Sequence, residues 1–262
     1  ITIDHSWFNE AVASQVRTTL GGELGIADEN FILSGTHNHS APDLGNSAEP
    51  NIAKYNTQLI EWHVEAAKAA LEDLKPCTGM FYGSTNPEGL NFIRHYVLED
   101  GTYKGDNFGD LNPSPYAGHT TEADNEMRLV KFHRAGGKDV VVANWQSHPH
   151  RTGGTKKYDV SADILGVMRD EMVEKLDCCF LYFTGGAGNI NPTSMIQEEN
   201  RTKDFMEQGK ELAKYAIQAD STYQKINGGA VKGTSEIFES KIDHTEDNLL
   251  RIGDKISELE LQ

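Results

Sequence analysis

Two histidines stand one residue apart where an apolar strand is expected to end. Residues 31–33 are Phe, Ile and Leu, and the motif Gly-Thr-His-Asn-His-Ser follows at residues 35–40. Side chains two apart on an extended chain point to the same face, so His37 and His39 can converge on one point. Neutral imidazole is a preferred zinc ligand and is also suited to proton transfer near pH 7. The motif predicts a metal or catalytic role, with a pair of histidines on a polar surface loop as the alternative.

A second expected strand end carries two more histidines. The apolar run at residues 140–143 leads into Gln-Ser-His-Pro-His, which places His148 and His150 just beyond the strand. One zinc held by His37 and His148 requires ring nitrogens about 3–4 Å apart, because each ligand lies ~2.0–2.1 Å from the metal. His39 or His150 is then free for proton transfer.

The third expected strand end is rich in small residues and is followed by Asn189 and Asn191. Small residues allow the backbone to approach a ligand closely, and a helix start offers unpaired N–H groups to an oxyanion. The loop lacks the Gly-Lys-Ser/Thr of a phosphate-binding loop. A tight turn packed on the sheet is the alternative. We expect one pocket to be built from the loops at residues 35–40, 146–151 and 184–192.

Other hydrolase patterns fit the sequence less well. No Gly-x-Ser-x-Gly elbow is present. Ser40 and Ser147 adjoin histidines in the sequence, but the members of a catalytic triad meet through the fold. The dinuclear pattern HxHxDH is approached at residues 37–43, yet Asp43 falls two places late and no histidine follows it. A mononuclear metal site is therefore favoured.

The elements that position these loops alternate between strands and helices, which predicts an α/β fold. We expect a mixed, mostly parallel sheet flanked by helices, with the site at the C-terminal ends of strands. His63 falls on an apolar helical stripe and is predicted to be a core histidine. Strands are expected at residues 1–4, 30–34, 77–84, 90–94, 127–133, 139–145, 178–183 and 229–242, and helices at 6–20, 51–74, 161–176, up to about 219, and through 249–259, with a long loop at 100–123.

Composition limits the classes of function. The chain has 262 residues with a net charge of −16, which repels phosphate backbones and argues against a nucleic-acid partner. No apolar stretch approaches the ~20 residues of a membrane span. The three cysteines have no CxxC spacing, so no disulfide framework is indicated. Cys178 and Cys179 lie in an apolar run and are expected to be core residues.

Five segments in order resemble the neutral/alkaline (non-lysosomal) ceramidases and their bacterial relatives. Residues 34–42 (SGTHNHSAP) are similar to the family's SGTHTHSGP, and residues 144–149 (NWQSHP) to its NWFAVHP or NFACHP. Residues 161–163 (SAD) resemble SADYPG, and residues 186–192 (GAGNINP) resemble GAAGDINP. Residues 91–94 (NFIR) are similar to a short strand that ends in Asn and Arg.

The resemblance implies a zinc amidohydrolase that cleaves the amide bond of an N-acyl lipid such as ceramide. It assigns Zn²⁺ to His37 and His148, and it implies that His39 and Arg94 face the scissile amide and the polar head of the substrate. Asn189 and Asn191 belong to the expected catalytic loop. Two alternatives stay open, a degenerate lipid- or glycan-binding relative and a metallo-esterase acting on another acyl substrate.

Two departures from the family pattern bear on these expectations. Asn191 stands where the ceramidases proper carry a serine, and the family's glutamate and tyrosine ligands have no match before Gln262. Asp43, Asp163 or His150 are the candidates for a substitute ligand. We expect residues 1–262 to be a single catalytic domain that is incomplete at both ends. Any signal sequence would lie outside these residues, and the resemblance is compatible with a secreted or periplasmic protein.

Overall fold

The computed structural model describes residues 1–42, 44, 48–105, 115–152, 159–228, 233, 234, 236 and 239. The chain divides into two units, Ile1–Val231 and Lys232–Gln262, and the elements below all belong to the first. Asp43 and the helix expected at residues 249–259 lie outside the described residues, as does nearly all of the strand expected at 229–242.

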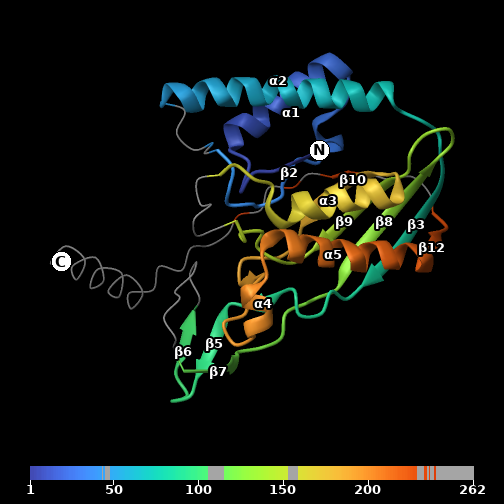
Figure 1. The fold of residues 1–262 in the computed structure, drawn as a ribbon. Helices are drawn as coiled ribbons and strands as arrows, with labels where there is room; N and C mark the ends of the chain where they lie inside the picture. Colours follow the sequence, from blue (N-terminus) through green and yellow to red (C-terminus); the bar gives the residue numbers. More distant parts are fainter. Residues whose placement is uncertain are drawn as a thin grey trace. The chain divides into compact units, whose positions relative to one another are not determined.

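A five-stranded sheet forms the centre of the first unit (Figure 1). β10 and β9 pair in parallel, whereas the pairings of β9 with β8, β8 with β3 and β3 with β12 are antiparallel. The sheet is therefore mixed and mostly antiparallel, not mostly parallel as predicted. A hairpin at Gly136, whose φ is +75°, returns β8 directly into β9. In sheet order the strands are β10 (Cys179–Thr184), β9 (Val140–Trp145), β8 (Met127–Arg134), β3 (Cys77–Thr85) and β12 (Gln224–Ile226).

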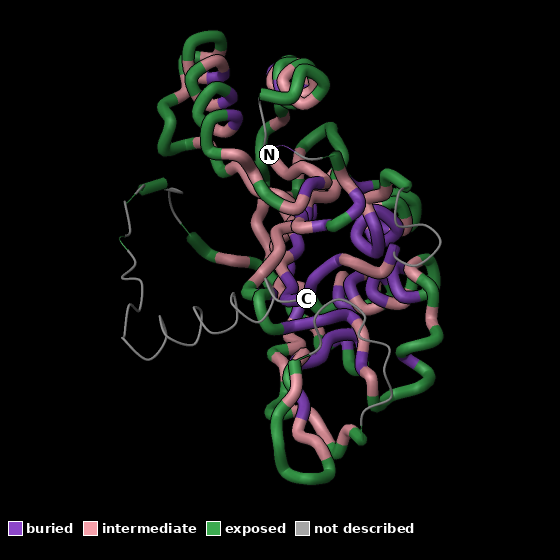
Figure 2. Tube along the Cα trace, turned by 90° about the vertical axis from the view of Figure 1, so that its left-hand side faces the viewer, coloured by how far each residue is buried: buried purple, intermediate pink, exposed green. Residues whose placement is uncertain are grey.

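Two helices, α3 (Asp163–Leu176) and α5 (Phe205–Ala219), cover one face of this sheet (Figure 1). The apolar residues of α5 recur with helical spacing, and Asp204 caps its start in a capping box with Glu207. The buried residues of this core come mainly from the strands of the sheet and from α3 and α5, and Figure 2 marks the buried stretches of the chain in purple. The largest fully buried side chains of this core are Trp145, Leu90, Met127, Leu129, Ile164, Met168, Met172 and Leu212.

A second layer packs α1 (Glu10–Leu24) against α2 (Pro50–Glu72) beside the parallel pair β1 (Thr2–Ile3) and β2 (Ser34–Gly35). The cap of α1 is Asn9, so the helix begins later than the expected residue 6. The helix also runs past its expected end at residue 20, through Gly21 and Gly22. It ends at Gly25, which adopts the left-handed conformation with φ 64°. The core of this layer includes Val12, Val16, Leu20, Leu44, Leu59 and Val64.

Smaller elements complete the unit. The loop expected at residues 100–123 contains two strands of a three-stranded antiparallel sheet. Residues 106–114 of this loop are not among the described residues. None of the described helices combines the length and apolar character that crossing a membrane requires. These elements are β4 (Phe92–Ile93), β5 (His95–Leu98), β6 (Tyr103–Gly105), β7 (Tyr116–His119), β11 (Ile190–Asn191), α4 (Glu198–Thr202) and the 3-10 helices Asp28–Asn30 and Asp220–Thr222.

Two expectations about single residues have different outcomes. His63 is buried and its Nδ1 donates to the Leu59 carbonyl at 2.6 Å, so the predicted core histidine is confirmed. Cys178 is buried but Cys179 is exposed, because neighbours on an extended chain point to opposite faces. Both thiols are free, as is that of Cys77.

Candidate metal centre

The loop that carries His37 leaves β2 through a close approach to the N-terminal segment. A Cβ on Gly35 would lie 2.8 Å from the His5 carbonyl oxygen, so only glycine fits there. His37 then adopts a φ of +68°, and its backbone N–H donates to His5 O at 2.8 Å. Its ring Nδ1 lies 2.5 Å from the carbonyl oxygen of Ser6. A carbonyl only accepts, so Nδ1 carries the proton and Nε2 keeps its lone pair.

His148 is presented in the same way by the loop after β9. Its ring is buried, and Nδ1 lies 3.1 Å from the carbonyl oxygen of Ile190 in β11. This carbonyl also fixes the proton on Nδ1 and leaves Nε2 as an acceptor. Burial lowers the pKa of His148, which keeps the ring neutral at pH 7.

The two accepting nitrogens face each other. Nε2 of His37 and Nε2 of His148 are 3.1 Å apart, within the separation expected of two ligands of one zinc. Two lone pairs at this distance repel unless a cation lies between them. Histidines that bind metals also characteristically donate their other ring N–H to a carbonyl group, as both do here. The donor set therefore fits a divalent metal such as zinc.

His39 completes a group of three imidazoles. The candidate ligand atoms of His37, His39 and His148 all lie within 4.8 Å of one another. The ring of His39 is exposed to solvent on one side. Partial burial is the main cause that lowers the pKa of His39 to about 4. The charges of the neighbouring imidazoles, first that of His150, act in the same direction. The ring is thus in its metal-binding form at pH 7. The sequence predicted His39 or His150 for proton transfer, and the structure places the His39 ring within reach of the same ion as His37 and His148.

His150 lies beside this group and faces the third loop. Its Nε2 is 3.2 Å from Oδ1 of Asn191, and its ring centroid is 5.5 Å from that of His148. Burial, followed by the charge of His148, lowers the pKa of His150 to about 4. Asn191 is buried, whereas Asn189 is exposed. The structure therefore brings His150 and Asn191 together at the edge of the cluster.

Arg94 reaches the same region through the short pairing of β4 with β11. Its backbone N–H donates to the carbonyl of Asn189 at 2.9 Å, directly beyond the pair Ile93–Ile190. Its charge acts on His148 and contributes to the lowered pKa of that ring. The three loops expected to share a site, together with Arg94, are therefore neighbours in the fold.

Asp163, a candidate substitute ligand, is engaged elsewhere. Its carboxylate accepts hydrogen bonds from Thr152 N, Thr152 Oγ1 and Ile164 N, each at 2.7 Å. Its charge acts on both His39 and His150 without joining the cluster of ligand atoms. Among the described residues, the ligand atoms within reach of one ion are those of the three imidazoles.

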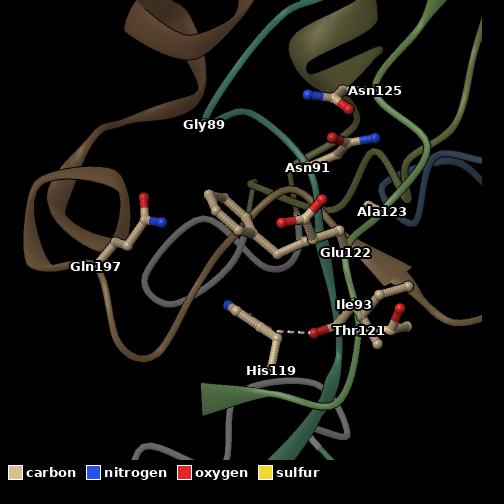
Figure 3. A pocket seen from close by; sticks show the side chains of 10 residues that line it. Gly89, Asn91, Ile93, His119, Thr121, Glu122, Ala123, Asn125 and Gln197 are labelled. Atoms are coloured by element: carbon tan, nitrogen blue, oxygen red, sulfur yellow. Dashed lines mark hydrogen bonds between the residues drawn. The ribbon is translucent and has the colours of Figure 1, made fainter.

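A surface cavity of about 740 Å³ is lined by residues of β4, β7 and the segment at 121–125, among others (Figure 3). None of the described residues that line it belongs to the imidazole cluster, so the cavity and the metal-binding chemistry are separate features. Its lining includes three amides, one carboxylate and the stacked rings of Phe92 and His119. The residues that line it include Asn91, Phe92, His119, Glu122, Asn125 and Gln197.

We expect His119, in the wall of this cavity, to make a contribution to the stability of the fold that is lost in acid. Its Nδ1–H donates to Ile93 O at 2.6 Å (Figure 3), and its Nε2 accepts from Ser194 Oγ at 2.9 Å. Burial lowers its pKa in the folded state, so below pH ~6.5 the unfolded chain binds the proton more readily. Stability from His119 is therefore fully present above pH ~6.5 and is lost as the pH falls.

We expect His119→Gln to flatten the fall in the free energy of unfolding below pH ~6.5, by at most about 1.4 kcal/mol per pH unit. Urea unfolding at a series of pH values measures this slope. The exposed His133, which pairs with Asp139, provides the control His133→Gln. Equal slopes for the parent and His119→Gln would contradict the prediction.

Comparison with known proteins gives a fold but no sequence family. No family model and no curated protein matches the chain. The chain is similar in structure to a solved ceramidase, described as complexed with C2, with a TM-score of 0.60 and 20% sequence identity. The match covers 84% of this chain and 35% of the ceramidase, so the chain spans about a third of that protein's length. The ceramidase-like character inferred from the motifs is thus supported at the level of the fold.

Proposed function

We propose that this ceramidase-like fold carries a zinc-dependent hydrolase site that cleaves the amide bond of an N-acyl lipid such as ceramide. The observation that carries the proposal is the pair of accepting Nε2 atoms of His37 and His148, 3.1 Å apart, with His39 within reach of the same ion. Three histidines are an established ligand set for catalytic zinc, with a fourth position left for water or substrate. The solved ceramidase supports the class of substrate.

The other roles in hydrolysis, proton transfer and binding of the substrate head, are assigned to residues of the chain. Zinc bound to such a set supplies a Lewis acid that activates water and polarises the substrate carbonyl. Nε2 of His150 lies within hydrogen-bond distance of Oδ1 of Asn191, and burial keeps the ring neutral at pH 7, which is the form that can accept a proton. With His39 counted among the ligands, we assign proton transfer to His150. Arg94 lies beside His148 and is assigned to the polar head of the substrate.

Asn189 and Asn191 form the remaining wall of the proposed site. Ala187, Gly188 and Asn189 form a turn that precedes β11, in which Ile190 N–H donates to Ala187 O at 3.0 Å. The exposed Gly186, Gly188 and Asn189 leave backbone accessible to a ligand at this turn. We assign the turn to holding the substrate amide, and Asn191 to orienting His150.

The test is turnover of a matched pair of substrates, one N-acyl and one O-acyl, with the same fatty acid and the same long-chain head. We expect zinc-dependent release of fatty acid from the N-acyl substrate. Faster release from the O-acyl partner would identify a metallo-esterase instead. Saturable binding of the N-acyl lipid to zinc-loaded protein without turnover would identify a binding module.

A further inference from the structure

We propose that Asp163 is a positioning residue that holds the two histidine-bearing loops of the metal centre in register with each other. The proposal rests on the proposed metal site and assigns no metal contact to Asp163. It concerns a hydrogen-bond network that joins residues 38–40, residues 150–152 and the start of α3.

The position of Asp163 is unusual in three respects. It is 1% exposed, it is the first residue of α3, and its φ of +55° lies in the left-handed region. Aspartate tolerates that region better than most side chains because it can hydrogen bond locally. A non-glycine residue stays in such a conformation only where the surrounding contacts determine it. Here those contacts are the three donors to its carboxylate, two from Thr152 and one from Ile164.

The directions of the hydrogen bonds follow from the carboxylate. An ionised carboxylate only accepts, so the Thr152 hydroxyl must give its single proton to Asp163. The Ser40 hydroxyl, 2.5 Å from Thr152 Oγ1, must therefore be the donor in that pair. The result is a directed chain from Ser40 to Thr152 to Asp163. Ser40 and Thr152 are separated by 112 positions in the sequence.

Two further bonds close the network on α3. The backbone N–H of Ser161 donates to Ser40 O at 2.9 Å, and Asp163 N–H donates to Ser161 Oγ at 3.0 Å. Ser40 adjoins His39, and Thr152 lies two residues beyond His150. Movement of either loop relative to the other would therefore break bonds in this network. The buried negative charge of Asp163 also favours a cation held by the neighbouring imidazoles.

The decisive variant is Asp163→Asn. The amide has one accepting oxygen, so in either orientation its NH₂ group faces a donor from Ile164 or from Thr152. We expect zinc affinity to fall by about 10- to 100-fold, the usual effect of removing a partner outside the ligand shell. The spectrum of the Co²⁺-loaded protein should lose its tetrahedral intensity. Thr152→Val removes the linking hydroxyl and should weaken zinc binding in the same direction, whereas Thr152→Ser retains the hydroxyl and should bind like the parent.

Met172→Ala is the matched control, because Met172 is a fully buried core residue of the same helix and its side chain makes none of the hydrogen bonds described for this network. It should lower the melting temperature and leave zinc affinity and the Co²⁺ spectrum unchanged. Equal weakening of zinc binding by Met172→Ala, or parent-like binding by Asp163→Asn and Thr152→Val, would overturn the proposal.

Hydrogen exchange of the metal-free protein separates this proposal from the proposed function. Asp163→Asn should speed amide exchange in residues 36–40 and 148–152 together, whereas Met172→Ala should speed it in α3. If the parent binds no zinc while this pattern is seen, the metal site is refuted and the positioning role stands. If the parent binds zinc and exchange in the two loops is unchanged by Asp163→Asn, the positioning role is refuted.

Discussion

His148→Ala is expected to weaken zinc binding by about a hundred- to a thousandfold. Complete four-ligand protein sites bind zinc with about 10–16 kcal/mol, so each ligand contributes about 2.5–4 kcal/mol. His148 should lie at the upper end, because its ring is buried and already oriented by the Ile190 carbonyl. Calorimetric titration of both proteins with zinc at one pH measures the change, since ligand deprotonation couples affinity to pH.

His63→Ala is the matched control for this variant. His63 and His148 are both 5% exposed, and each donates through Nδ1 to a backbone carbonyl. His63 lies in α2, outside the imidazole cluster, so its loss should lower stability and leave zinc affinity intact. If His148→Ala binds zinc as the parent does, the facing nitrogens are not metal ligands.

Removing the metal with EDTA is expected to reduce hydrolysis of the N-acyl substrate to background, and zinc should restore it. A serine-directed fluorophosphonate should have no effect. Asn191 cannot form an acyl-enzyme, so the reaction must use activated water or another nucleophile. Ser40 donates to Thr152, and the Ser194 hydroxyl that pairs with His119 is fully buried. Neither is placed to react with the reagent.

Mass spectrometry of the fluorophosphonate-treated protein provides the internal check. One label per chain accompanied by loss of turnover would replace the water mechanism with a serine nucleophile. Turnover that persists in EDTA, with zinc shown to be absent from the protein, would remove the metal from the mechanism. The inactive variant His148→Ala should be unaffected by either treatment.

The local part of the fold could be predicted from the sequence, because turn and periodicity signals act over a few residues. The hairpin at Gly136 and the helix over Pro50–Glu72 follow from such signals. The pairing of β3 with β8 joins segments about fifty residues apart, and no local pattern records which strands become neighbours. For that reason the alternation of strands and helices predicted a parallel sheet where most pairings are antiparallel.

In the candidate site, too, some features could be predicted from the sequence and others depend on contacts between distant segments. The sequence predicted that histidines follow the strand ends and that His37 and His148 lie together, and their Nε2 atoms are 3.1 Å apart. Side chains two apart share a face only on extended backbone, however, and His37 has a φ of +68°. The two rings nevertheless join one cluster, with their planes at 90°. That geometry depends on the close passage of Gly35 against the N-terminal segment, which lies thirty residues away in the sequence.

The carbonyls of Ser6 and Ile190 that hold the two facing imidazoles have a consequence for how this site changes during evolution. Main-chain oxygens are supplied by every amino acid, so the side chains at these two positions are free to vary without altering the proton on either ring. Divergent homologues can therefore retain the same imidazole geometry while sharing few identities around it. Comparison of main-chain paths will find such relatives where comparison of residue identities does not.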